Sequence, residues 1–187
     1  MTRPAHSAVE VPVLETERLL LRGHRLEDFA NCAAMWADPR VTQYIGGKPL
    51  SEEECWARLL RYVGHWALMG FGYWVAAEKA TGNFVGEIGF ADYKRDLKPF
   101  HEGVPEIGWA LNAEGQGRGL ATEGVRAAVA WGDAQGSWGR TACIIAPENL
   151  ASIRVAVKCG YKESQVASYK GHAVLLFVRE MKTSLAE

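Results

Sequence analysis

The segment from Gly115 to Glu123 contains the residue types with the clearest chemical potential in this chain. Its three glycines, at positions 115, 117 and 119, come just before a long alanine-rich pattern that predicts a helix. The first turn of a helix has unpaired backbone N–H groups at the positive end of the helix dipole, so it binds anions such as phosphate. Glycines lack a Cβ atom and let an anion approach these groups closely. The glycines alone fit a phosphate site and a simple turn equally well.

Two common nucleotide-binding patterns do not fit this segment. A P-loop requires GxxxxGK followed by serine or threonine, and no lysine follows these glycines. A Rossmann fingerprint requires GxGxxG, whereas here the glycines are spaced by two and position 120 is leucine. The segment also comes late in the chain, after several predicted strands. Both interpretations are therefore rejected.

The elements that would position this segment alternate between strand and helix patterns. Apolar periodicity and capping signals predict the order β-α-α-β-β-β-α-β-α-β-β, in one mixed α/β layer. The strand, glycine segment, helix and strand between residues 104 and 146 are expected to form a parallel crossover. The predicted elements are a strand 19–22, helices 26–37 and 52–67, a hairpin 73–77 and 84–93, a polar loop 94–103, a strand 104–111, a helix 119–134, a strand 141–146, a helix 149–159 and strands 161–169 and 173–179.

The length of 187 residues predicts about one domain. We expect it to cover residues 13–182, with a flexible polar lead-in at 1–12 and a short tail at 183–187. The formal net charge of −1 gives no global field that would attract nucleic acid or an anionic membrane, so neither is expected as a partner.

Targeting and cysteine patterns favour a cytoplasmic protein. No apolar run reaches the ~18 residues of a membrane span, and residues 1–12 lack the apolar core of a signal peptide. The four cysteines show no spacing typical of a metal site. We expect them to be small buried residues in a reducing compartment, and we expect no metal.

Three motifs in order resemble the GNAT superfamily of N-acetyltransferases, over about residues 14–180. Gln116-x-x-Gly119-x-Ala121 matches the superfamily signature (Q/R)xxGx(G/A). The opening run from Leu14 to Arg22, the run Glu106-Ile107-Gly108-Trp109, and the helix with Asn149 and Ser152 that ends at Gly160 are similar to the branch of ribosomal-protein-serine and -alanine N-acetyltransferases. The resemblance implies a three-layer α/β/α fold of the α+β kind. Its central sheet would be mixed and mostly antiparallel, with about seven strands that splay apart between the fourth and the fifth.

The resemblance implies acetyl-CoA as the acyl donor. Its pyrophosphate would lie on the helix N-terminus, and its pantetheine arm would fill the gap between the splayed strands, bonded to the backbone of Trp109 and Leu111 and to the side-chain amide of Asn149. Arg118 would contact a phosphate or point into water. The remaining residues of the pyrophosphate site would be Gln116, Gly117, Gly119, Leu120, Ala121 and Thr122.

The resemblance also assigns candidate catalytic residues. Glu106 is the first choice for a general base, acting directly or through water, and a surface or salt-bridged carboxylate is the alternative reading. Glu87 is the second choice, and a lone His172 near the last hairpin is more often structural. Many relatives have an acid tyrosine four residues before the helix-terminal glycine, but Ala156 stands there, so Ser152 is the substitute acid. Backbone N–H groups near Trp109 and Ala110 would bind the oxyanion.

The implied function is transfer of an acetyl group to a primary amine by direct attack in a ternary complex. The missing tyrosine leaves a non-catalytic acyl-CoA-binding module as the alternative. The acceptor is a peptide or protein N-terminus or a small-molecule amine, bound between the first two helices, the 94–103 loop and the final hairpin. Monomer and homodimer both remain open. Candidate lining residues are Trp36, Tyr44, Trp66, Phe100 and His101, although a core position is expected for the tryptophans.

Overall fold

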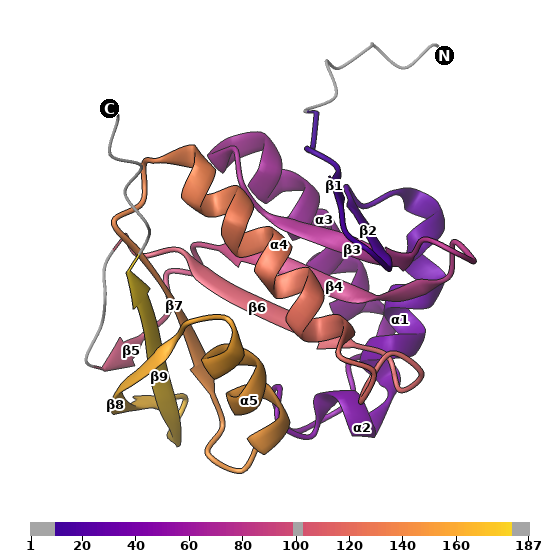
Figure 1. Ribbon diagram of the computed structural model, residues 1–187. Helices are drawn as coiled ribbons and strands as arrows, with labels where there is room; N and C mark the ends of the chain where they lie inside the picture. The colour runs from indigo at the N-terminus through magenta and orange to yellow at the C-terminus, as the bar shows by residue number, and fades with distance from the viewer. Residues whose placement is uncertain (1–9, 99–102, 181–187) are drawn as a thin grey trace, which may run out of the picture.

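A computed structural model describes residues 10–98 and 103–180, and these residues build one sheet with helices on both faces (Figure 1). The nine strands lie in the order β1-β2-β3-β4-β6-β7-β9-β8-β5. β1 and β5 have two residues each, so the sheet has seven longer strands, as the sequence predicted. The strands are β1 (Leu14–Glu15), β2 (Leu19–Arg22), β3 (Tyr73–Glu78), β4 (Phe84–Ala91), β5 (Leu97–Lys98), β6 (Glu106–Leu111), β7 (Arg140–Ile145), β8 (Lys162–Tyr169) and β9 (His172–Glu180).

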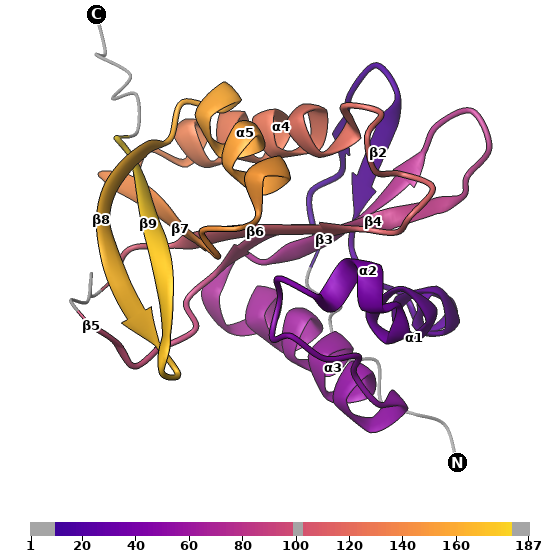
Figure 2. The same cartoon turned by 90° about the horizontal axis from the view of Figure 1, so that it is seen from below.

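The helices form the two outer layers. The helices α1 (Phe29–Ala37), α2 (Pro39–Thr42) and α3 (Glu52–Met69) cover one face of the sheet, and α4 (Leu120–Gln135) and α5 (Leu150–Lys158) cover the other (Figure 2). The predicted three-layer fold is therefore confirmed. None of the helices in the described part of the chain combines the length and the apolar character of a membrane span.

The longer elements follow the predicted order, and the short ones were not predicted. A 3-10 turn at Leu26–Asp28 precedes α1, where the sequence predicted one continuous helix. The two-residue strands β1 and β5 and the four-residue helix α2 were also missed. Elements of this length carry no hydrophobic period, so periodicity cannot reveal them. Residues 1–9 of the predicted lead-in, the last two residues of the predicted domain (181–182) and the whole predicted tail (183–187) lie outside the described part of the chain.

Local sequence signals explain where α3 begins and ends and where α5 begins. Ser51 and Glu54 form a capping box at the start of α3, and Gly70 ends that helix in a left-handed conformation. The Asn149 side chain caps α5 by accepting a hydrogen bond from the Ser152 N–H. Both caps agree with the predicted positions.

The sheet divides between β6 and β7. These strands are parallel, as expected of the crossover, but their register has one pair, Glu106 with Ala142. The Ala142 N–H donates to the Pro105 carbonyl at 3.0 Å, and beyond this point the strands separate. We call this place the β6–β7 vertex. The other strand pairs are antiparallel, so the predicted splay in a mixed, mostly antiparallel sheet is confirmed.

The main core lies between the sheet and α4 and includes an aromatic group. Trp66 of α3 packs edge-on against Trp74 of β3 and Trp131 of α4, with ring centroids 5.0 and 5.6 Å away. Burial of such large rings dominates the stability of a core. The four cysteines are buried as free thiols, as predicted.

Tyr73 lies across two neighbouring strands that both have glycine in its path. Its register partner on β4 is Gly89, which pairs in turn with Gly108 on β6. A Cβ atom at position 108 would lie 2.0 Å from the Tyr73 hydroxyl oxygen. Tyr62 of α3 stacks on the Tyr73 ring at 4.4 Å, with the planes 11° from parallel. Gly108 therefore makes room for the tyrosine hydroxyl over the middle of β6, and Gly89 lets β4 approach the backbone of β3, where a Cβ atom would lie 2.3 Å from the Tyr73 Cα atom.

This packing predicts a specific coupling between Gly108 and Tyr73. Gly108→Ala is expected to lower the free energy of unfolding by about 1–3 kcal/mol, because the new methyl group meets a rigidly packed hydroxyl. In a Tyr73→Phe background the cost should be smaller, since the obstructing oxygen is gone. Urea unfolding of the two single variants and the double variant measures this coupling. Equal costs of Gly108→Ala in both backgrounds would contradict the packing described.

Candidate active site

The glycine segment leads directly into α4. Gly117 and Gly119 have φ angles of 73° and 79°, in the left-handed region where residues with a Cβ atom are strained. Gly119 is the N-cap residue of α4, so the first backbone N–H groups of a 16-residue helix follow it. At position 115 glycine is required by space, because a Cβ atom there would lie 2.8 Å from a methyl group of Val85. The first turn of α4 thus offers unpaired backbone N–H groups, and Gly117 and Gly119 before it have no side chain that would block them. This arrangement fits an anion.

The start of the chain holds this segment in place. The Glu123 carboxylate, in the first turn of α4, accepts hydrogen bonds from the Thr16 hydroxyl and the Arg18 backbone N–H, both at 2.7 Å. The Arg18 guanidinium pairs with Glu123 and donates to the Arg118 carbonyl at 2.9 Å. Arg18 is therefore a second cation beside Gly119, in addition to Arg118, and no sequence motif indicated it.

Two residues that the sequence predicted to bind acetyl-CoA have partners within the protein. The Arg118 side chain is 47% exposed and forms an ion pair with Glu78 at 2.5 Å, so the pair lies at the surface and neither sequence reading of Arg118 is decided by it. The Gln116 side-chain amide donates to the Leu111 carbonyl at 3.0 Å. Gln116 therefore ties the glycine segment back to the end of β6.

The backbone of β6 is available on the side where β7 separates. The Asn112 N–H donates to the Val85 carbonyl, so even-numbered residues of β6 direct their backbone groups toward β4. The Pro105 carbonyl instead accepts from Ala142 of β7, so odd-numbered residues face the opening. Trp109 and Leu111 are on the side expected for a pantetheine arm. The N–H of Ala110 is bonded toward β4, which leaves Trp109 as the better oxyanion donor of the two.

The N-terminus of α5 borders the other side of the opening. Asn149 caps this helix through its side-chain oxygen, which accepts from the Ser152 N–H at 3.1 Å, so its NH₂ group is left to bind a ligand. Ser152 is half-buried in the first turn. Ala156, at the position where the family resemblance implies a tyrosine, is fully buried in the main core.

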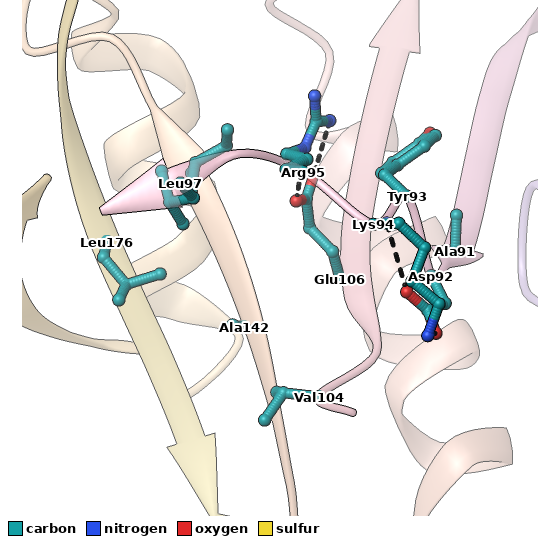
Figure 3. Close-up of a pocket in the computed structure, with 11 residues that line it drawn as sticks. Ala91, Asp92, Tyr93, Lys94, Arg95, Leu97, Val104, Glu106, Ala142 and Leu176 are labelled. Carbon is teal, nitrogen blue, oxygen red and sulfur yellow. Dashed lines mark hydrogen bonds and ion pairs between the residues drawn. The ribbon is translucent and has the colours of Figure 1, made fainter. Parts of the chain in front are cut away.

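Glu106 lies at the β6–β7 vertex and is held by an arginine. The Arg95 Nε and Nη2 atoms each donate to one Glu106 carboxylate oxygen, both at 2.7 Å (Figure 3). The Arg95 guanidinium lies over the rings of Tyr93 and Tyr169, 4.3 and 4.8 Å from their centroids. Glu106, Arg95 and Tyr93 line a small cavity of about 30 Å³ together with residues of β7 and β9, and this is enough for one water molecule.

Glu87, the second choice for a base, is enclosed in a buried network. Its carboxylate accepts hydrogen bonds from Trp36 Nε1 at 2.7 Å and Cys32 Sγ at 3.3 Å, and it pairs with His24 Nε2 at 2.9 Å. Burial alone would raise its pKa, but the hydrogen bonds from His24 and Trp36 and the nearby Arg58 charge outweigh burial and lower the pKa of Glu87. The side chain is 1% exposed, so no acceptor reaches it. The potential metal ligands of His24, Cys32 and Glu87, within 4.8 Å of one another, are already joined by these bonds.

The other sequence candidates are more scattered. Trp36 and Trp66 are buried, as expected, although Trp36 faces the polar network rather than a purely apolar core. Tyr44 is partly exposed, and His172 is exposed at the turn between β8 and β9. Phe100 and His101 lie outside the described residues.

This geometry has counterparts among known proteins. The acetyltransferase (GNAT) domain family matches residues 18–162 of the chain. The chain belongs to this family of acetyltransferases. It is therefore an acyltransferase enzyme, and the resemblance inferred from the motifs is confirmed.

Individual relatives extend over nearly the whole domain. YkkB of Bacillus subtilis (strain 168) is 30% identical over 171 residues, which are 89% of this chain and 95% of YkkB. A GNAT-family acetyltransferase from Bordetella pertussis is 32% identical, with a TM-score of 0.78 over 90% of this chain and 99% of that one. RimL, a ribosomal-protein acetyltransferase solved with coenzyme A, shares the fold at a TM-score of 0.76 and 15% identity, over 92% of this chain and 100% of its own.

The buried network predicts a pH-dependent contribution of Glu87 to stability. Because its pKa is lowered on folding, ionised Glu87 stabilises the fold above the ordinary glutamate pKa of ~4.3, and this contribution is lost as the pH falls through the folded value. Glu87→Gln should lower the free energy of unfolding at pH 7 by about 3 kcal/mol. The difference from the wild type should shrink in the acid range. Urea unfolding from pH 7 to pH 3 checks this, and a gap that stays constant would contradict it.

Proposed function

We propose that the chain transfers the acetyl group of acetyl-CoA to a primary amine by direct attack in a ternary complex, in the cytoplasm and without a metal. The observation that carries this proposal is the opening between β6 and β7, which has the Glu106 carboxylate at its closed end and the glycine-capped N-terminus of α4 beyond the other end of β6. The residues present fit the donor, since Gly117 and Gly119 leave the N–H groups of α4 accessible and Trp109 offers backbone groups in the opening. Acetyl-CoA supplies the activated acyl group as a thioester.

The attacking amine must be neutral, and this requirement depends on the acceptor. A lysine amine with a pKa of ~10.4 needs about 4.6 kcal/mol to become neutral at pH 7, whereas an α-amine with a pKa of ~7.7–8.0 needs about 1 kcal/mol. A base therefore contributes more for a lysine-like amine.

Glu106 is our candidate for this base. Arg95 donates one hydrogen bond to each of its oxygens, and each oxygen keeps further lone-pair capacity. The cavity beside it has room for one water. We infer that Glu106 accepts the amine proton through such a water, with Arg95 holding the carboxylate in place.

Ser152 is our candidate for the proton donor to the leaving thiolate. It takes this role because Ala156 removes the tyrosine that many relatives use. A thiol pKa near 8.5 means that weak assistance is enough. A non-catalytic acyl-CoA-binding module is the alternative, and oligomeric state, monomer or homodimer, is independent of both.

Donor binding is tested by two glycines with the same backbone conformation. Gly119→Ala and Gly82→Ala each place a side chain in the left-handed region, at φ of 79° and 74°, and should cost about 1 kcal/mol of stability. Gly119 caps α4, so only its variant should weaken acetyl-CoA binding, by about tenfold. Calorimetric titration with acetyl-CoA measures this. Similar affinities in both variants would argue against the proposed pyrophosphate site.

The catalytic assignments are tested by thiol release with a panel of amines. Glu106→Gln should lower kcat/KM by about 10²- to 10⁴-fold, and most at lower pH, where more of the amine is protonated. Glu163→Gln, at an exposed position on β8, is the matched control and should be unchanged. Ser152→Ala should lower kcat about tenfold. Full activity of either site variant would remove that residue from its role, and acetyl-CoA binding without turnover of any amine would favour the non-catalytic module.

A further inference from the structure

The side from which an acceptor reaches the vertex can be identified, because successive side chains of β6 point to opposite faces of the sheet. Ile107 and Leu111 pack in the main core with α4, so Glu106, Gly108 and Ala110 face the opposite layer. Ala110 packs there against Met35 and Trp36 of α1. Since the donor site lies between α4 and α5, an acceptor that meets the donor at the vertex approaches from the layer of α1 and α3.

Arg58 of α3 lies in this layer and is linked to β6 through two aromatic rings. Its guanidinium carbon is 4.0 Å from the ring centroid of Trp36. Its Nη1 atom donates to the Tyr62 hydroxyl at 3.0 Å. Tyr62 stacks on Tyr73, whose hydroxyl lies over Gly108. The positive charge is therefore held near the centre of the acceptor side.

The hydrogen-bonding capacity of Arg58 is only partly used. Among residues 10–98 and 103–180, no carboxylate oxygen lies within 4.0 Å of its nitrogens. The nearby carboxylate of Glu87 is bonded to His24, and that of Glu106 is bonded to Arg95. The Arg58 Nε atom is buried without a partner, a situation that costs free energy until a ligand or water satisfies it. A guanidinium with free donors matches a carboxylate or phosphate group.

We propose that the acceptor is an amine that also carries an acidic group, and that Arg58 binds this group. The inference rests on the proposed function of the vertex. The charge of Arg58 also disfavours a protonated amine nearby, and so favours the neutral form that attacks. A polycationic acceptor is disfavoured for the same reason.

Matched acceptors test this proposal with the intact protein. One pair is L-alanine and L-alaninamide, and a second pair is two C-terminally amidated peptides, with aspartate or asparagine after the N-terminal serine. The wild type should prefer the acidic member of at least one pair by about 10- to 100-fold in kcat/KM. A preference in the first pair identifies a free amino acid, and a preference in the second identifies a peptide N-terminus.

Variants of two arginines on α3 then assign the preference. Arg58→Met keeps the side-chain stem over Trp36 and should remove the preference through KM of the acidic acceptor, with kcat/KM of the neutral one changed less than about threefold. Arg61→Met removes an exposed charge from the same helix and should keep the preference. Equal losses for both acceptors in Arg58→Met would show a structural role and overturn the assignment.

Two further measurements keep the proposal decidable. If Arg58→Met does not fold, Arg58→Lys retains the charge without the planar fork and should reduce the preference only in part. Calorimetric titration of the same acceptor pairs in the presence of CoA reports binding without chemistry. Equal affinities for acidic and neutral members would overturn the proposal, whereas acidic preference in binding with no turnover would instead count against the proposed function.

Discussion

The separation of β6 from β7 is the constraint on which the rest of the site depends. Two parallel strands that paired along their length would consume the backbone groups of Trp109 and Leu111, and the sheet would have no opening. Here the pairing stops after Glu106 and Ala142, so unpaired backbone must be satisfied by something other than a strand. The glycine segment, α4 and α5 all border this opening, and Glu106 marks its closed end. One interrupted ladder thus positions the groups that we propose for donor binding and proton transfer.

The sequence predicted the long elements and the backbone of the glycine segment well, for identifiable reasons. Hydrophobic period, the Ser51–Glu54 capping box and the Asn149 cap are local signals, and they place α3 and α5 within a few residues. The glycine segment was equally readable, because left-handed backbone at Gly117 and Gly119 requires that residue type. Fold and family could therefore be inferred before any coordinates were known.

The acceptor side was not predictable in the same way, because its contacts join distant parts of the chain. Arg95 lies in a polar loop with no motif, and its hold on Glu106 depends on how that loop returns to β6. Arg58 occupies an ordinary helix position, and only the packing of Trp36 and Tyr62 around it shows a buried, incompletely satisfied cation. The link between Arg18 and Glu123 spans 105 residues. Such pairs depend on tertiary structure and leave no periodic trace in the sequence.

The strand order near the C-terminal end has a consequence for the time at which the site is completed. β9 lies between β7 and β8, so β8 has no route into the main sheet until β9 has been made. Tyr169, which flanks Arg95, is the last residue of β8. During synthesis at about 5–20 residues per second, the glycine segment and α4 can form while the chain is still growing. The aromatic enclosure of Arg95, and with it the final placement of Glu106, must wait until β8 and β9 have left the ribosome.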